Sequence, residues 1–196
     1  RLRSRGLGDV YKRQALLLLK PQESAEIRED LYVTGYAYPF IEPYVLEMAF
    51  PALNELLVFS YGFTFEGELV PPIQDETWMI QLAWENGIEP MLVLTPFTQG
   101  VFNNQLIQTL VEEESVRENV ITNLLKVVEE KGYVGVDVDF EYVRAQNREG
   151  YAEFVGELRA AMNEKGYRVS VALAPKTSSD QKGLLYAVSY THLRAH

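Results

Sequence analysis

Three segments of the chain share one pattern, in which a helix-like stretch ends at a glycine and continues directly into an apolar strand. These segments span residues 85–97, 129–141 and 163–175. Their glycines, Gly87, Gly132 and Gly166, occupy the position where a helix C-terminus favours a left-handed residue. Two earlier strands are predicted at residues 31–39 and 56–63, which are rich in β-branched and aromatic residues. Five strands alternating with helices imply a parallel sheet covered by helices, either a doubly wound layer or part of a (β/α)8 barrel.

Helical periodicity fills the intervals between these strands. Ser115 and Glu118 have the spacing of a capping box at the start of a helix that continues to Gly132. Asn147 is predicted to cap the next helix, and Asp75 to open a shorter one. A complete (β/α)8 barrel needs about 250 residues. We therefore expect an α/β fold that is a partial TIM barrel, holding about the first five βα units.

Charge and composition exclude several classes of partner and site. The chain has 18 Lys and Arg against 28 Asp and Glu, and its net charge of -10 disfavours nucleic acid. It contains no Cys, which excludes a disulfide framework and a Cys-type zinc site. The apolar run at residues 15–19 is too short to span a bilayer.

The two ends of the chain differ in character from the rest. Residues 4–14 resemble a translated sequencing-library adaptor, and residues 188–196 resemble the same adaptor read from its opposite strand. We expect four parts, namely artefactual residues 1–14, a linker or module remnant at 15–30, a partial barrel at 31–187 and artefactual residues 188–196. Both histidines, His192 and His196, lie in the last part, so histidine chemistry is not expected in the barrel.

The acidic segment Gly135–Tyr142 is the most informative about function. Because strand side chains alternate between faces, Asp137, Asp139 and Glu141 project to one side, about 6.6 Å apart. A solvated edge strand also alternates in this way, but strands in a βα series are normally apolar on both faces. Clustered carboxylates raise at least one pKa, so one acid can stay protonated beside an ionised partner. We therefore predict a catalytic role for the three acids, at the end of the strand where βα enzymes keep their sites.

This segment resembles the D-G-x-D-x-D-x-E signature of family 18 glycoside hydrolases. The matching positions are Gly135, Asp137, Asp139 and Glu141, and Val134 replaces the first Asp, as in the branch that lyses peptidoglycan. Further similarity to the spore-cortex-lytic or germination type lies in residues 33–41, 56–69 and 172–186. The resemblance implies a (β/α)8 barrel that cleaves β-1,4-linked N-acetylglucosamine polymers. Residues 14–21 also resemble the closing strand of a LysM glycan-binding repeat.

The resemblance implies a role for each acid. Glu141 would be the general acid that protonates the glycosidic oxygen, while the substrate's own acetamido oxygen attacks C1 with retention. Asp139 would hold and polarise the acetamide, and Asp137 would share a proton or hydrogen bond with Asp139. No metal ion or other cofactor is implied.

Aromatic rings near strand ends are candidates for stacking on the apolar faces of sugars. Tyr36, Tyr61, Phe63 and Phe97 hold such positions. Packing in the core or at the rim is at least an equal alternative for each of them. We select Tyr36 and Tyr61 as the predicted substrate-binding residues.

The resemblance also implies a partner and a location. The partner would be a polysaccharide containing N-acetylglucosamine. The location would be outside the cytoplasm, in the cell wall or spore envelope. The protein would be monomeric when the barrel is complete. Two alternatives stay open. One is a metal-dependent glycosyltransferase in which Asp137 and Asp139 bind a divalent ion, although no Gly-rich phosphate loop follows any strand. The other is a non-catalytic glycan-binding barrel, although Glu141 is retained.

Overall fold

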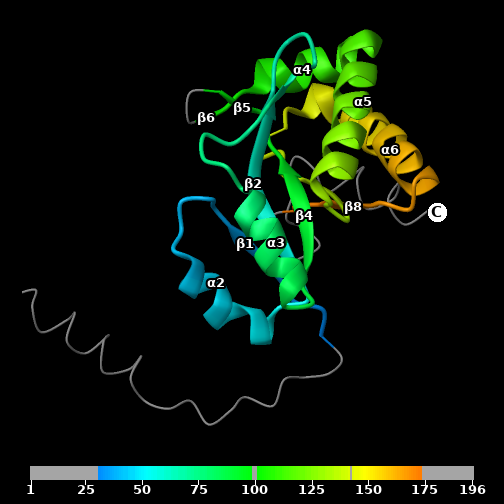
Figure 1. Cartoon of the computed structure of the whole chain (residues 1–196). Coiled ribbons are helices and arrows are strands. Elements are labelled where there is room, and N and C mark those ends of the chain that lie inside the picture. The colour runs from blue at the N-terminus through cyan, green and yellow to red at the C-terminus, as the bar shows by residue number, and fades with distance from the viewer. Residues whose placement is uncertain (1–30, 99–100, 142, 174–196) are drawn as a thin grey trace, which may run out of the picture. The chain divides into compact units, whose positions relative to one another are not determined.

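The computed structural model describes residues 31–98, 101–141 and 143–173. The chain divides into two compact units, and the second, which begins at Val33, holds all the helices and strands given below (Figure 1). The predictions for residues 1–14, 15–30 and 188–196 fall outside the described residues and stay predictions.

Five parallel strands form the main sheet, in the order β1-β2-β4-β7-β8. Their bounds are β1 (Thr34–Ala37), β2 (Glu55–Phe63), β4 (Glu89–Leu94), β7 (Gly135–Val138) and β8 (Arg168–Val171). Order in space equals order in the chain, whereas a doubly wound sheet reverses its order at a switch point. The predicted parallel α/β fold is confirmed, and this order favours its barrel form.

Helices connect successive strands, as the sequence predicts. The connections contain α2 (Pro43–Ala49) with the 3-10 turn η1 (Phe50–Ala52), α3 (Thr77–Glu85), α4 (Asn104–Glu112) with α5 (Glu114–Lys131), and η2 (Ala145–Asn147) with α6 (Arg148–Glu164). Helices α5 and α6 lie side by side (Figure 1). The short strand β3 (Leu69–Val70) pairs antiparallel with β2, and β5 (Phe97–Thr98) pairs with β6 (Val101–Phe102) in a hairpin. Among the described residues, no helix is both long and apolar enough to cross a bilayer.

The predicted helix ends are confirmed more fully than the predicted helix starts. Gly87, Gly132 and Gly166 have φ angles of 71°, 80° and 82°, the left-handed conformation that lets the chain leave a helix for a strand. The capping box is wrong, because α5 already begins at Glu114 and has no side-chain cap, which leaves Ser115 inside the helix. Asn147 holds the position before α6, also without a side-chain cap.

The start of α3 agrees better with the sequence prediction. The carboxylate of Asp75 accepts hydrogen bonds from the backbone N–H of Thr77, at 3.3 Å, and from its hydroxyl, at 2.7 Å. Asp75 therefore stabilises the first turn of this helix, although the N-cap position itself belongs to Glu76.

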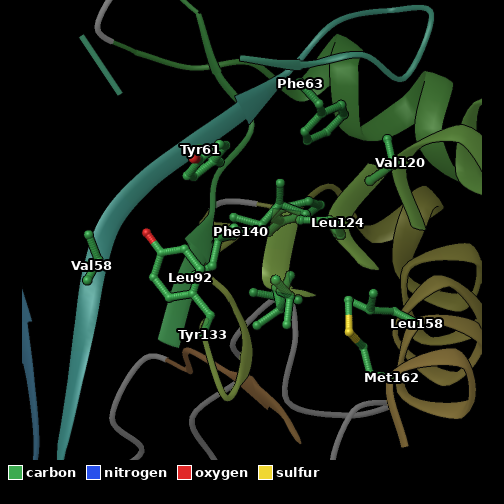
Figure 2. Close-up of a cluster of buried hydrophobic side chains, with 14 of the residues drawn as sticks. Val58, Tyr61, Phe63, Leu92, Val120, Leu124, Tyr133, Phe140, Leu158 and Met162 are labelled. Atoms are coloured by element: carbon green, nitrogen blue, oxygen red, sulfur yellow. The ribbon is translucent and has the colours of Figure 1, made fainter. Parts of the chain in front are cut away.

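The sheet is buried on both faces, as parallel sheets usually are. On one face, strand residues meet α5 and α6 in a large apolar core, which Figure 2 shows with Val58, Tyr61, Phe63, Leu92, Val120, Leu124, Tyr133, Phe140, Leu158 and Met162. On the other face, Leu57, Met91 and Val93 form a separate small cluster. The two clusters mark the helix side and the opposite side of the sheet.

Gly135 allows β7 and β8 to approach closely at their amino ends, where it pairs with Arg168. A Cβ at Gly135 would overlap the backbone oxygen of Arg168 and lie 2.8 Å from its backbone nitrogen. Both neighbours are main-chain atoms, so no side chain can rotate away. The glycine of the acidic segment is therefore required by strand packing.

Replacing Gly135 with Ala is expected to lower the free energy of unfolding by about 2–3 kcal/mol, because the added methyl group separates two paired strands. Gly156, on the exposed face of α6, is the matched control, since a Cβ there meets no atom within 4 Å. Gly156→Ala should raise the stability by about 0.5–1 kcal/mol. Urea unfolding followed by circular dichroism measures both, and a Gly135→Ala chain as stable as the wild type would contradict the close approach.

Candidate active site

The acidic segment occupies the carboxyl end of β7, between β4 and β8. Asp137 lies within the strand, which ends at Val138 and is shorter than predicted. The backbone N–H of Asp139 still donates to the carbonyl oxygen of Leu94 at 3.0 Å, so the pairing with β4 extends one residue further. Glu141 follows and is exposed. The three acids thus pass from the sheet interior to its surface within five residues.

The carboxyl group of Asp137 is buried, 3% exposed, and each of its oxygens accepts a hydrogen bond from a hydroxyl group. The Tyr36 hydroxyl donates to Oδ2 at 2.8 Å, and the Ser170 hydroxyl donates to Oδ1 at 2.5 Å. Burial of a carboxylate is costly unless such bonds compensate for the lost water. Asp137 is therefore held in place from β1 on one side and from β8 on the other.

The bond between Tyr36 and Asp137 also reports the shape of the sheet. Two strands, β2 and β4, separate β1 from β7. Strands lie about 4.8 Å apart, so in a flat sheet the backbones of β1 and β7 would be about 14 Å apart. A 2.8 Å bond between their side chains requires the sheet to curl, with the acids on its concave face. This curvature is that of a barrel wall.

Asp139 has an unusual protonation equilibrium. Its side chain is half-buried, and burial, followed by the negative charges of Asp137 and Glu141, raises its pKa to about 6. A neighbouring anion disfavours a second one, so the proton stays on Asp139 at pH values where an isolated Asp has lost it. The acidic segment therefore contains one carboxyl group that titrates close to neutral pH, as the sequence predicts.

Replacing Asp139 with Asn is expected to stabilise the chain more at pH 7.5 than at pH 4.5. The folded chain holds the Asp139 proton up to about pH 6, whereas the unfolded chain loses it near pH 4. Stability from this group is therefore present at low pH and declines as the pH rises through that interval. Urea midpoints of both chains at the two pH values test this, and an equal difference at both would contradict a raised pKa.

Tyr36 and Tyr61, both predicted to bind substrate, have different surroundings. Tyr36 is 49% exposed, and its hydroxyl is bonded to Asp137. Partial burial and the charge of Asp137 raise its pKa, so the phenol keeps its proton and donates it in a hydrogen bond. Tyr36 thus orients Asp137, and a stacking role for its exposed ring stays a prediction.

Tyr61 is a core residue and not a sugar platform, which corrects the sequence prediction. It is 3% exposed and lies in the helix-side core (Figure 2). With strict alternation along β2, Tyr61 would lie on the same face as Leu57, away from the helix-side core. The pairing of β2 with β4, however, shifts register between Val58 and Tyr61. Such an irregularity reverses the side that a strand residue faces. No alternation rule reveals this shift.

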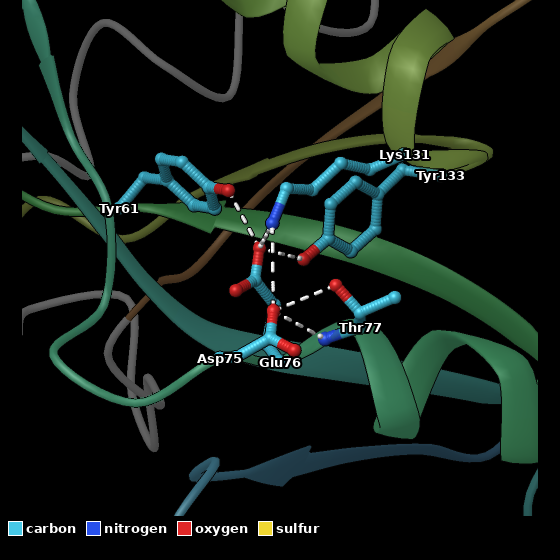
Figure 3. Close-up of polar contacts among 6 residues, drawn as sticks. All are labelled: Tyr61, Asp75, Glu76, Thr77, Lys131 and Tyr133. Atoms are coloured by element: carbon cyan, nitrogen blue, oxygen red, sulfur yellow. Dashed lines mark hydrogen bonds and ion pairs between the residues drawn. The ribbon is translucent and has the colours of Figure 1, made fainter.

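The hydroxyl of Tyr61 takes part in a buried polar cluster around Glu76, which is 2% exposed (Figure 3). One oxygen of Glu76 accepts hydrogen bonds from Tyr61 at 2.6 Å, from Lys131 at 2.7 Å and, more weakly, from Tyr133 at 3.4 Å. These bonds link β2, the start of α3, the end of α5 and the approach to β7. The cluster fixes the helices to the sheet behind the acidic segment.

Replacing Tyr61 with Phe is expected to lower the free energy of unfolding by about 1–2 kcal/mol, because Glu76 loses its shortest hydrogen bond. Tyr133→Phe removes the 3.4 Å bond to the same oxygen and should cost less. Chemical unfolding compares the two variants. A larger loss for Tyr133→Phe, or weaker glycan binding by a stable Tyr61→Phe chain, would contradict the core assignment.

An aromatic groove of about 420 Å³ is lined by residues from the carboxyl-terminal half of β2 and from the segments that follow β1, β2 and β4. We use this name for the pocket lined by Tyr38, Pro39, Phe40, Phe59, Ser60, Gly62, Val70, Pro71, Pro72, Ile73, Gln74 and Phe97. Ring centroids of Tyr38 lie 5.0 Å from those of Phe40 and 4.7 Å from those of Phe59. Phe97 was a sequence candidate here. Tyr38 and Phe40 were not among the sequence candidates. Their alternating positions just after the first predicted strand could have indicated them.

The described part of the chain was searched for clusters of residues that could bind a metal ion. Within residues 31–98, 101–141 and 143–173, no three His, Cys, Asp or Glu side chains are grouped in a way that could hold a metal ion. The chemistry that the site offers is that of carboxyl groups and hydroxyl groups.

A barrel wall with acids at the carboxyl end of a central strand is an arrangement found in glycosidases. Comparison with known proteins identifies which class of them this is. The family model "Glycosyl hydrolases family 18" matches residues 100–195. The chain belongs to glycoside hydrolase family 18, as the acidic segment predicted.

Individual relatives agree with this assignment. The chain is 32% identical over 139 residues to the cortical fragment-lytic enzyme of Bacillus subtilis (strain 168), covering 70% of the chain and 32% of that protein. The spore cortex-lytic enzyme SleL of Bacillus megaterium QM B1551 has a similar structure, with a TM-score of 0.70, 26% identity and coverage of 78% of this chain and 37% of that one. The chain thus spans about a third of the length of these relatives.

The fold itself extends to more distant structures. A class V chitininase from Pseudomonas fluorescens Pf-5 matches with a TM-score of 0.72 at 21% identity, over 79% of this chain and 48% of that one. Such a likeness concerns the fold alone. Together with the parallel strand order, it confirms the predicted partial TIM barrel.

Proposed function

We propose that the protein carrying this chain is a glycosidase that cleaves β-1,4-linked N-acetylglucosamine glycans by substrate-assisted catalysis with retention. The observation that carries this proposal is the graded environment of three acids within five residues. Asp137 is buried and bonded on both oxygens, Asp139 has its pKa raised to about 6, and Glu141 is exposed. Such unequal carboxyl groups are what acid-base catalysis on a sugar requires.

In the proposed reaction, each acid has one task. Glu141 donates its proton to the glycosidic oxygen, and the acetamido oxygen of the substrate attacks C1 as the bond to the leaving group breaks. The oxazolinium ring so formed is opened by water, whose proton returns to Glu141. Asp139 holds the acetamide in the attacking orientation. Asp137 orients Asp139 by sharing a proton or a hydrogen bond with it.

The substrate is proposed to be the glycan of a spore envelope or cell wall. The relatives named as cortex-lytic support this, as does Val134 in place of the first acid of the signature. The aromatic groove adds support, because apolar sugar faces pack on flat aromatic rings. We accordingly propose an extracytoplasmic location and a monomeric protein. The glycosyltransferase alternative gains nothing from the comparisons, which match glycosyl hydrolases.

Replacing Glu141 with Gln is expected to lower the rate of glycan hydrolysis by about 10³-fold, because the amide cannot donate the proton. Glycan affinity should stay within about twofold, since the side chain keeps its size. The assay is release of reducing ends from spore cortex and from chitin by the protein that carries this chain. Glu153→Gln, an exposed change on α6, is the matched control and should be as active as the wild type.

Other outcomes of this assay separate the alternatives. Undiminished hydrolysis by Glu141→Gln would remove Glu141 from the reaction. Glycan binding without any release of reducing ends by the wild type would favour a non-catalytic glycan-binding barrel. Activity that disappears with EDTA would favour a metal-dependent enzyme.

A further inference from the structure

One wall of the aromatic groove is the short segment of residues 70–74, which we call the groove wall. It begins in β3, contains two consecutive prolines and carries the fully exposed side chain of Ile73. The groove wall lines the groove together with four aromatic rings, those of Tyr38, Phe40, Phe59 and Phe97. A fully exposed side chain contributes little packing to its own segment. The position of the groove wall therefore depends on the residues at its two ends.

The hairpin turn that precedes the groove wall packs directly on helix α5. The backbone N–H of Thr64 closes this turn by donating to the carbonyl oxygen of Glu68 at 2.9 Å. Gly67 in the turn has a φ angle of 83°. A Cβ at Gly67 would lie 2.7 Å from the Cβ of Asn119 and 2.8 Å from the carbonyl oxygen of Val116. Only a glycine allows the turn to approach the helix this closely.

Two side chains of α5 also hold this turn by hydrogen bonds. The side-chain amide of Asn119 donates to the carbonyl oxygen of Glu66 at 3.0 Å. That of Asn123 donates to the carbonyl oxygen of Gly67, also at 3.0 Å. Residues four apart lie on the same face of a helix. The two amides therefore bind consecutive carbonyl groups of the turn from one side of α5.

The same helix holds the other end of the groove wall. Lys131, the last residue of α5, donates to the carboxylate of Glu76 at 2.7 Å and lies 4.0 Å from that of Asp75 (Figure 3). Asp75 and Glu76 follow directly after the groove wall. Both ends of the groove wall are thus fixed to α5, whereas the groove residues named above come from other elements.

We propose that Asn119 and Asn123 are positioning residues for glycan binding, which hold the groove wall in the position that a bound glycan meets. The substrate in this inference rests on the proposed function. A wall that is already ordered costs little conformational entropy when a ligand binds, whereas a released wall has to be ordered first. The two amides therefore act on the affinity for the glycan, and the cleavage step stays with the acids of the acidic segment.

Replacing both Asn119 and Asn123 with Ala is expected to raise KM about tenfold and to leave kcat within about twofold. The assay is release of reducing ends from spore cortex by the protein that carries this chain. Alanine favours a helix more than asparagine does, so α5 itself is not weakened. Thr122→Ala, an exposed change on the same helix, is the matched control and should keep the wild-type KM.

Hydrogen exchange measured without glycan tests the hold on the wall separately from the reaction. Backbone amides of residues 64–76 should exchange faster in the double variant and at the wild-type rate in Thr122→Ala. If the double variant does not fold, Asn119→Ala alone changes an exposed side chain and should give smaller effects in the same directions.

Three results would overturn the proposal: unchanged exchange in this segment, faster exchange with an unchanged KM, or a loss of activity confined to kcat. Faster exchange in a protein whose wild type hydrolyses no glycan would instead overturn the proposed function. The hold of α5 on the groove wall would then stand without its role in glycan binding.

Discussion

The burial of the Asp137 carboxyl group is the constraint on which the rest of the site depends. A carboxylate inside a parallel sheet needs partners on both oxygens, and its partners come from β1 and β8. Strand β8 is adjacent, but β1 is three strands away, so the tyrosine hydroxyl reaches it only across a curved sheet. The position of the acids therefore depends on the curvature of the sheet and on the close approach of β7 and β8 at Gly135.

The helix-side core maintains this arrangement from behind. Glu76 accepts hydrogen bonds from donors on β2, on α5 and in the segment between α5 and β7, and its carboxylate is almost completely buried. Breaking one partner from a buried ion pair is costly, although such a pair is weak evidence for net stability. The physical effect of the cluster is to give the helices one position on the sheet.

Much of this could be predicted from the sequence, because it depends on local patterns. A glycine between a helix and an apolar strand marked three of the five strands, and β-branched and aromatic residues marked the two earlier ones. The period of two at Asp137, Asp139 and Glu141 likewise placed the acids together. Tyr61 could not be assigned in this way, because a shift of register in β2 depends on the partner strand. Ser170 was missed for the same reason, since its importance comes from pairing with a distant segment.

The strand ends sooner than its alternating pattern suggested, and this difference matters for the chemistry. Had the regular strand continued through Glu141, all three acids would have faced the same sheet interior, and mutual repulsion would have affected them alike. Because β7 ends at Val138, Asp137 stays in the sheet, Asp139 sits at its margin and Glu141 stands in solvent. Burial at that margin, together with the charges of the two neighbouring acids, raises the pKa of Asp139. An exposed carboxyl group, a half-buried one that titrates near neutral pH and a fully buried one bonded to two hydroxyl groups follow from where one strand stops.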